Sequence, residues 1–406
     1  MMKDSLLILA SQILMALFNL AASAFLARNL SMDGLGEYQL ILAYLGVASI
    51  AALPGMNTAI YKSVLKGYDS IYGKAQKRVL VSVLICSGLL MTTSWIYTNV
   101  RGNFKVGQVL FFLSLLLPAT GFQKYDSVLL PKCRFVASRL ISVLSSFLTA
   151  IVIGLTSFYT HDFKAVLLAF IGINGMLTIA GHFIAKMSLG SAEPKNDEEK
   201  KIFRQGWEFS LLAVFNTIVL KIDRIILGVI DPRYLAVYYI GTIMPRIVKD
   251  NLKNIAAVPI SWWGRKTPQD NIQKLLSNWY KILLFGVCLS AIIIAAAPVV
   301  LPIFFGEEYR KSVIIAQVLS LTIPTNILAA FVFSFDTFQR RGRYVQIHSY
   351  IQKIFYCLSL VIFLQFWKIK AVIFSILLME LYRGVAAIVY LFIILKRSNS
   401  IDAKEI

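Results

Sequence analysis

The sequence is poor in acidic residues and in polar stretches long enough to form a soluble domain. Its 406 residues include 21 Asp and Glu against 41 Lys and Arg, and charged residues make up only 15% of the chain. Soluble domains carry about 25% charged residues. Because 58% of the residues are hydrophobic and the mean hydropathy is +0.70, no room remains for a soluble catalytic domain.

Cysteine and histidine are also scarce. The chain has 4 cysteines, none in a CxxC pair, and 3 histidines that are far apart in the sequence. We therefore expect neither a disulfide framework nor a metal centre. No nucleotide-binding glycine loop occurs, which argues against a pump driven directly by ATP.

Long apolar runs dominate the sequence instead. A helix needs about 20 mainly apolar residues to cross roughly 30 Å of hydrocarbon. Twelve runs of this kind predict an all-α polytopic membrane protein with about 12 transmembrane helices. The runs are 5–27, 37–60, 79–98, 105–123, 135–158, 164–185, 206–230, 234–260, 280–305, 312–336, 344–366 and 370–395.

The positive charges, with a formal net value of +20, are unevenly distributed along the chain. Of the 41 Lys and Arg, 26 lie in or beside the N-terminus, the even-numbered loops and the C-terminal tail, and 9 lie in the odd-numbered loops. Lys and Arg are enriched in cytoplasmic loops. The pattern predicts a multi-pass protein with both termini in the cytoplasm, and it gives no reason to expect nucleic acid as a partner.

The longest hydrophilic stretch, SAEPKNDEEKKIFRQ at 191–205, separates the first six apolar runs from the last six. Its mixed charge and its proline predict a solvated cytoplasmic connector. We therefore expect an N-lobe with helices 1 to 6 at 1–190 and a C-lobe with helices 7 to 12 at 206–396. A cytoplasmic tail is expected at 397–406.

The two halves resemble each other. Phe18-Asn19 corresponds to Phe215-Asn216, and LSLLLP at 113–118 corresponds to LSLTIP at 319–324. Because six spans is an even number, both halves enter the membrane in the same direction, as parallel repeats around a pseudo-twofold axis. Such repeats are typical of transporters that bind substrate between the halves and work by alternating access.

Several charges lie inside the predicted spans. An Arg or Lys at a helix centre costs about 2.5 to 3.5 kcal/mol in lipid, so six of them would cost on the order of 15–20 kcal/mol. This exceeds the whole stability of a typical protein. We expect the six to line a wet cationic cavity between the halves, where they would bind an anion. They are Lys221, Arg224, Arg246, Lys249, Lys353 and Arg383.

The seventh span concentrates these charges. Lys221, Asp223 and Arg224 share one arc of the expected helix with Asn216, while isoleucines fill the opposite side. Asn216 and its repeat counterpart Asn19 complete the predicted substrate-binding set. A purely structural alternative is that Asp223 only orients Arg224.

Carboxylates inside the spans are candidates for ion coupling. They are Asp223, Asp336 and Glu380. Two structural alternatives stay open here. Glu380 and Arg383 are three residues apart and can form an ion pair within one helix. Lys249 can reach along its helix toward the inner interface.

Four segments carry a family resemblance. They are ARNLSMDGLGEYQL (27–40), LPGMNTAIYKSVLKG (53–67), IDRIILG (222–228) and LPIFFGEEYRKS (301–312). In this order and spacing they resemble the Wzx-type polysaccharide flippases of the multidrug/oligosaccharidyl-lipid/polysaccharide exporter superfamily. The chain departs from the family pattern at Lys62, where Arg is common. Lys lacks the planar guanidinium that binds two phosphate oxygens at once, so a phosphate contact at Lys62 is in doubt.

The resemblance implies a V-shaped bundle of two six-helix lobes in the bacterial inner membrane. It implies that the protein flips an undecaprenyl-diphosphate-linked oligosaccharide, such as an O-antigen or capsule repeat unit, to the periplasmic leaflet. A proton or sodium gradient would supply the energy, without another cofactor. The bilayer, the lipid-linked cargo, and the polymerase and chain-length proteins of the same pathway are the expected partners.

Three alternatives remain. The cargo could be another lipid-linked glycan precursor of the teichoic or peptidoglycan type, which shares the diphosphate handle. A multidrug antiporter of the same superfamily would carry organic cations, which a cationic cavity repels. A membrane polymerase or ligase of lipid-linked glycans would need a long external loop, and the sequence predicts only short ones.

Overall fold

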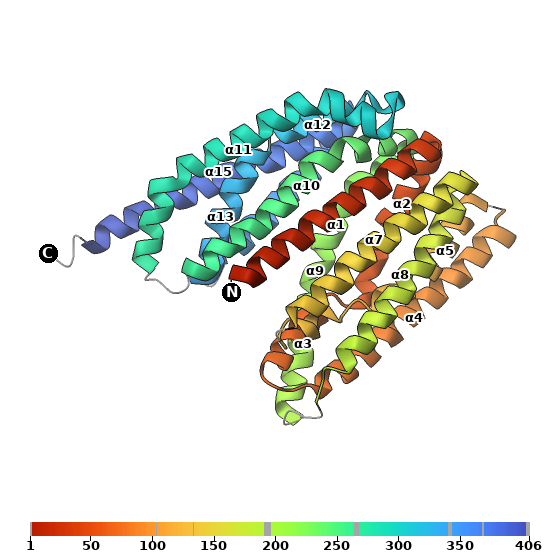
Figure 1. Ribbon diagram of the computed structural model, residues 1–406, viewed down its shortest axis with the longest axis horizontal. Helices are drawn as coiled ribbons and strands as arrows, with labels where there is room; N and C mark the ends of the chain where they lie inside the picture. The colour runs from red at the N-terminus through yellow and green to blue at the C-terminus, as the bar shows by residue number, and fades with distance from the viewer. Residues whose placement is uncertain are drawn as a thin grey trace. The chain divides into compact units, whose positions relative to one another are not determined.

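The computed structural model describes residues 2–102, 104–132, 134–190, 196–263, 268–339, 343–367 and 369–402. Every regular element in these ranges is a helix. The helices pack into two units, Met1–Ala236 and Val237–Ile406 (Figure 1). The prediction of an all-α chain is confirmed.

Unit 1 is a set of long helices joined by short loops. In Figure 1, α4, α5, α7 and α8 run side by side, with α4 against α5 and α7 against α8. α1 packs on α7, and α9 packs on α2 and α3. The elements are α1 (Met2–Asn29), α2 (Met32–Ala48), η1 (Ser49–Ala52), α3 (Met56–Leu65), α4 (Ser70–Asn99), α5 (Phe104–Gly121), α6 (Asp126–Leu129), α7 (Phe135–Thr160), α8 (Phe163–Lys186) and α9 (Asn196–Ile230).

The second predicted span is a broken helix. α2 passes into η1, Leu53 adopts a left-handed backbone with φ 49°, and α3 begins after Pro54 and Gly55. Proline lacks an N–H and disfavours a helical residue before it, and here the left-handed Leu53 before Pro54 ends the helix. Gly55 brings the break close to α9, because its N–H donates to Ser210 Oγ at 3.0 Å.

A buried carboxylate holds together three loops at one end of unit 1. Asp69 is 4% exposed, and its Oδ2 accepts from Lys132 Nζ at 2.5 Å and from Gly190 N at 2.7 Å. These residues lie before α4, before α7 and after α8. The sequence does not reveal this contact, because Lys132 and Gly190 lie 63 and 121 residues from Asp69.

Unit 2 contains the remaining helices. α11 packs on α13, α14 packs on α15, and α13 also contacts α15. α15 continues to Asp402, into the predicted tail. The elements are α10 (Pro232–Trp263), which starts at the junction with unit 1, α11 (Pro268–Phe305), η2 (Glu307–Tyr309), α12 (Ser312–Ser320), α13 (Ile323–Gln339), α14 (Arg343–Leu364) and α15 (Ile369–Asp402).

The two repeat-related prolines occupy different places in their helices. Pro324 is the second residue of α13, directly after a bend of 42° between α12 and the first part of α13. Proline is well tolerated in a first helical turn, where its missing N–H has no partner to lose. Pro118 lies inside α5, three residues before that helix ends. The matching motifs therefore differ in structure: a bend precedes Pro324, whereas Pro118 lies within a helix.

Nine helices in the described ranges are long and apolar enough to cross a membrane, or ten if α12 and α13 form one bent span. The remaining predicted spans, the seventh and eighth, fall on α9 and α10, which are 35 and 32 residues long. Both carry charges within their apolar stretches, which lowers their mean hydropathy. The contacts of α9 with α2 and α3 put it in unit 1, and the lobe bounds at 190 and 206 stay a prediction.

Candidate functional site

The charges of α9 lie where this helix crosses α2. The aliphatic stem of Lys221 packs over Gly46, so closely that a Cβ at position 46 would stand 2.6 Å from Lys221 Cε. Lys221 is half-buried. The missing side chain of Gly46 therefore makes the room in which the Lys221 stem lies.

Asp223 and Arg224 follow on the same unbroken helix, and both are half-buried. Asp223 Oδ1 accepts from the backbone N–H of Arg224 at 2.8 Å. With Lys221, the stretch holds two cations and one carboxylate, a formal excess of one positive charge. The half-buried Asn216 shares this helix, and Asn19 is exposed on α1.

A buried ionic cluster joins three helices of unit 2. Glu380 on α15 is 6% exposed, and its Oε1 lies 3.3 Å from Lys249 Nζ on α10. Arg383 NH1 lies 3.8 Å from Glu380 Oε2 and donates to Asn326 Oδ1 on α13 at 2.7 Å. The predicted pair of Glu380 and Arg383 is present, and Lys249 joins it instead of reaching toward the interface.

Two further predicted cations have aromatic neighbours. The Arg246 guanidinium stands 5.7 Å from the ring centroid of Tyr239. Lys353 Nζ stands 5.6 Å from the ring centroid of Tyr350 and contacts Ser349 Oγ at 2.8 Å. Such contacts stabilise a cation by about 0.5–2 kcal/mol. The side chain of Asp336 lies outside the described residues.

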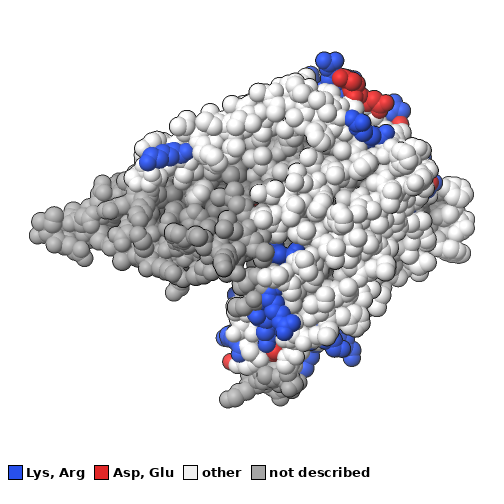
Figure 2. Space-filling view, in the orientation of Figure 1, with Lys and Arg blue, Asp and Glu red and all other residues white. Residues whose placement is uncertain are grey.

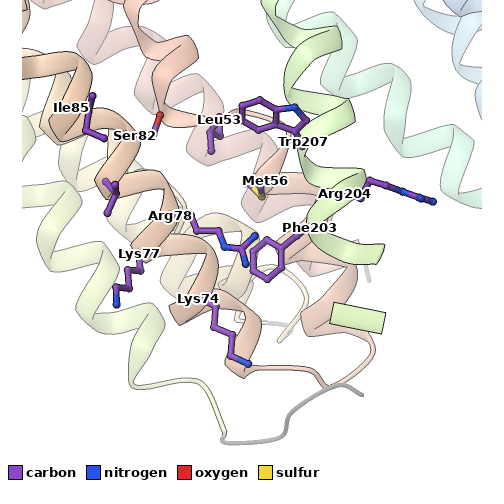
Figure 3. Close-up of a pocket in the computed structure, with 11 residues that line it drawn as sticks. Leu53, Met56, Lys74, Lys77, Arg78, Ser82, Ile85, Phe203, Arg204 and Trp207 are labelled. Carbon is purple, nitrogen blue, oxygen red and sulfur yellow. The ribbon is translucent and has the colours of Figure 1, made fainter. Parts of the chain in front are cut away.

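A groove between α4 and α9 holds a second group of cations, which the sequence suggested only as topology signals. This α4–α9 groove has a volume of about 1000 Å³, and Figure 3 shows residues of α4 and α9 on its two sides with Leu53 and Met56 between them. It is lined by Leu53, Met56, Lys74, Lys77, Arg78, Val81, Ser82, Ile85, Phe203, Arg204 and Trp207.

The cations of this groove occupy one end. Figure 2 shows Lys and Arg side chains gathered at the end of unit 1 formed by α3 and the start of α9. Arg78 lies over the ring of Phe203, 3.7 Å from its centroid, and Lys74 pairs with Glu199 at 2.7 Å. The only trace of this site in the sequence is the spacing of Lys74, Arg78, Val81 and Ile85, which puts them on one helix face.

Lys124 is another residue that the sequence did not single out. It is 3% exposed, and its Nζ donates to the carbonyl oxygen of Leu53 at 3.4 Å, at the break of the second span. Among the residues that the structure describes it forms no ion pair. Across all residues that the structure describes, no three His, Cys, Asp or Glu side chains come together as a metal site.

Residues 25–313 match a family model described as "Polysaccharide biosynthesis protein". The chain belongs to this polysaccharide biosynthesis family. The match covers more than half of the chain and includes α9 with Lys221, Asp223 and Arg224, as well as the α4–α9 groove. No curated protein sequence matches the chain.

Solved structures of transporters share the fold of this family member. An inward-facing multidrug resistance MATE transporter of the MOP superfamily is 14% identical, with a TM-score of 0.69 over 98% of this chain and 99% of that one. A MATE in the straight conformation is 16% identical, with a TM-score of 0.63 over 99% and 96%. A eukaryotic MATE transporter is 17% identical, with a TM-score of 0.62 over 98% and 97%.

The predicted resemblance to a polysaccharide exporter of this superfamily is confirmed in family and in fold. The fold is the two-lobed helical fold of these transporters. The family match and a fold shared with transporters agree with the prediction of a multi-pass membrane transporter rather than an enzyme.

Proposed function

We propose that this protein flips an undecaprenyl-diphosphate-linked oligosaccharide, an O-antigen or capsule repeat unit, from the cytoplasmic to the periplasmic leaflet by alternating access. The observation that carries the proposal is the pair of half-buried cations, Lys221 and Arg224, in the apolar stretch of α9 in a member of a polysaccharide biosynthesis family.

A diphosphate suits these cations chemically. It carries about two negative charges, and charge-assisted hydrogen bonds from Lys and Arg to phosphate are roughly twice as strong as neutral ones. The sugars cannot cross hydrocarbon unaided, whereas the lipid tail can stay in the bilayer. We assign Lys221, Arg224 and Arg246 to the head group, with Lys249, Lys353, Arg383, Asn19 and Asn216 as further members of the binding set.

An ion gradient supplies the energy in this proposal. Asp223 and Asp336 are the coupling carboxylates. Glu380 is the weaker candidate, because Lys249 and Arg383 already give it a structural role between α10, α13 and α15. Protons or sodium ions serve as the coupling ion.

The decisive experiment is transport in vesicles containing the purified full chain. A fluorescent lipid-linked oligosaccharide should move between leaflets faster than in empty vesicles, and an imposed proton or sodium gradient should change the rate. Movement that never exceeds that of empty vesicles contradicts the proposal. Indifference to both gradients contradicts the coupling.

A second candidate is a multidrug antiporter, which the likeness to MATE transporters favours. Organic cations would be repelled by the excess of one positive charge at Lys221, Asp223 and Arg224. The same vesicles loaded with an ethidium-type dye decide between the two. Export of the dye without movement of the lipid-linked oligosaccharide would establish the multidrug antiporter. Movement of a teichoic-type or peptidoglycan precursor instead would keep the flippase function but change its cargo.

We place the protein in the bacterial inner membrane with both termini and the 191–205 connector in the cytoplasm, beside the polymerase and chain-length proteins of the pathway. Alkaline phosphatase and green fluorescent protein fusions at residue 200 and at the C-terminus check this. We expect fluorescence without phosphatase activity at both sites, since Lys and Arg are enriched on the cytoplasmic side. Phosphatase activity at residue 200 would show that the connector lies in the periplasm and that the proposed orientation is wrong.

A further inference from the structure

We propose that the α4–α9 groove is a loading site that binds the phosphate head group of the lipid-linked cargo before the cargo reaches Lys221. This inference rests on the proposed function, because it takes the cargo to be a phosphate-bearing lipid. All lining residues belong to unit 1.

Arg78 supplies the phosphate contact. Its guanidinium lies 3.7 Å from the centroid of the Phe203 ring, and Phe203 is itself only 6% exposed. In Figure 3 the Arg78 side chain points from α4 toward Phe203 on α9. Stacking on a buried ring fixes the plane of the guanidinium, and a fixed planar fork of N–H donors matches two phosphate oxygens. Among the described residues, Arg78 forms no ion pair.

Lys74 is the second cation on this side of the groove. Its side chain is 41% exposed, and its Nζ pairs with Glu199 at 2.7 Å, so it can share its charge with an incoming phosphate. Arg204 does not contribute in the same way. It pairs with Glu208 at 3.6 Å and points away from the groove in Figure 3. Arg78 and Lys74 therefore set the phosphate position.

The other end of the groove is apolar and accessible. Val81, Ile85 and Trp207 are 49%, 61% and 52% exposed. Lys74 and Ile85 are about 16 Å apart along the axis of α4, at about 1.5 Å per residue. A surface that changes from cationic to apolar over this distance is complementary to a lipid with a phosphate at one end. A free phosphate would leave the apolar end uncovered.

The groove lies on the same side of α9 as Lys221. Phe203 and Lys221 are 18 residues apart, which is five full turns, so both lie on the same side of the helix. This side packs against the broken second span, through Ser210 at Gly55 and Lys221 at Gly46. A head group bound at Arg78 therefore lies at one end of the seam that leads to Lys221. This continuity favours the cargo over bulk phospholipid.

Fluorescence quenching of Trp207 tests the proposal. The full chain is placed in phosphatidylcholine nanodiscs and titrated with a polyprenyl phosphate whose chain carries bromine, which quenches tryptophan on contact. The chain has 6 tryptophans, so the Trp207 signal is the difference between the natural protein and Trp207→Phe. We expect saturable quenching, with an apparent Kd raised at least tenfold in Arg78→Gln and less in Arg78→Lys.

The control is Lys201→Gln, which removes one exposed positive charge near the start of α9 from outside the groove. It should leave the apparent Kd within twofold of the natural value. Brominated phosphatidylglycerol should quench Trp207 at least tenfold more weakly than the polyprenyl phosphate. Equal affinity for both lipids would overturn the proposal, and so would unchanged binding by Arg78→Gln.

Transport separates this inference from the proposed function. In vesicles, Arg78→Gln should slow flipping at low cargo concentration and recover at high cargo, because it weakens loading only. If the natural protein flips no lipid-linked oligosaccharide, the proposed function fails regardless of quenching. If the natural protein flips its cargo and Arg78→Gln binds and transports like it, the loading site alone fails.

Discussion

Replacing Lys221 and Arg224 together by Gln is expected to reduce transport of the lipid-linked oligosaccharide at least 100-fold. Each cation lost removes a charge-assisted hydrogen bond of about 1.5–3 kcal/mol to the diphosphate, and 1.4 kcal/mol corresponds to tenfold. The replacement also reverses the sign of this stretch, because Asp223 remains. Vesicle transport measures the effect, and membrane-inserted protein is quantified in parallel.

Two further variants separate charge from position at this site. Lys200→Gln with Lys201→Gln removes two charges from the same helix outside its apolar stretch and should leave transport within twofold. Gly46→Ala keeps every charge but puts a Cβ 2.6 Å from Lys221 Cε, so it should displace Lys221 and slow transport about tenfold. Full transport by the double Gln variant would remove Lys221 and Arg224 from the substrate site.

Glu380→Gln is expected to destabilise unit 2 by about 3–5 kcal/mol. The substitution keeps the shape of the side chain but leaves Lys249 and Arg383, whose side chains are 15% and 21% exposed, without their carboxylate. Buried cations without a partner are costly because the protein interior replaces their hydration poorly. The apparent melting temperature in detergent should fall by on the order of 10 °C.

A double substitution identifies the cause of that loss. Lys249→Gln with Glu380→Gln removes one cation together with the carboxylate, so it should be more stable than Glu380→Gln alone. Glu307→Gln is the matched control, because Glu307 is 73% exposed and pairs with Arg310 at 3.6 Å on the surface. A melting temperature of Glu380→Gln equal to that of the control would show that the cluster contributes little.

Hydrophobicity alone was enough to predict the long unbroken helices. The apolar runs at 135–158 and 164–185 became α7 and α8 with bounds shifted by at most two residues, because an apolar stretch of spanning length satisfies its backbone hydrogen bonds within a helix. The run at 37–60 is broken into α2, η1 and α3 in the structure. Pro54 is a residue that disrupts helices, but a sequence gives no sign that Gly55 packs against Ser210 beside a left-handed Leu53.

For the candidate site too, the sequence predicted contacts within one helix but not contacts between helices. The neighbours Glu380 and Arg383 were paired correctly because they lie on one helix turn. Lys249 lies 131 residues from Glu380, and a sequence gives no distance between side chains on different helices. The cations Lys74 and Arg78 were taken only as topology signals, since nothing in α4 indicates that Phe203 and Trp207 of α9 form the opposite wall.

The sequence by itself determined the membrane class, the positions of the helices and which of them carry charge, because these follow from the cost of exposing polar groups to lipid. Tertiary structure decided which charges meet. It placed Lys221 over Gly46, Glu380 between Lys249 and Arg383, and Arg78 on Phe203. The reason is physical: ion pairs and stacked cations act over a few ångströms, and only packing brings distant segments that close.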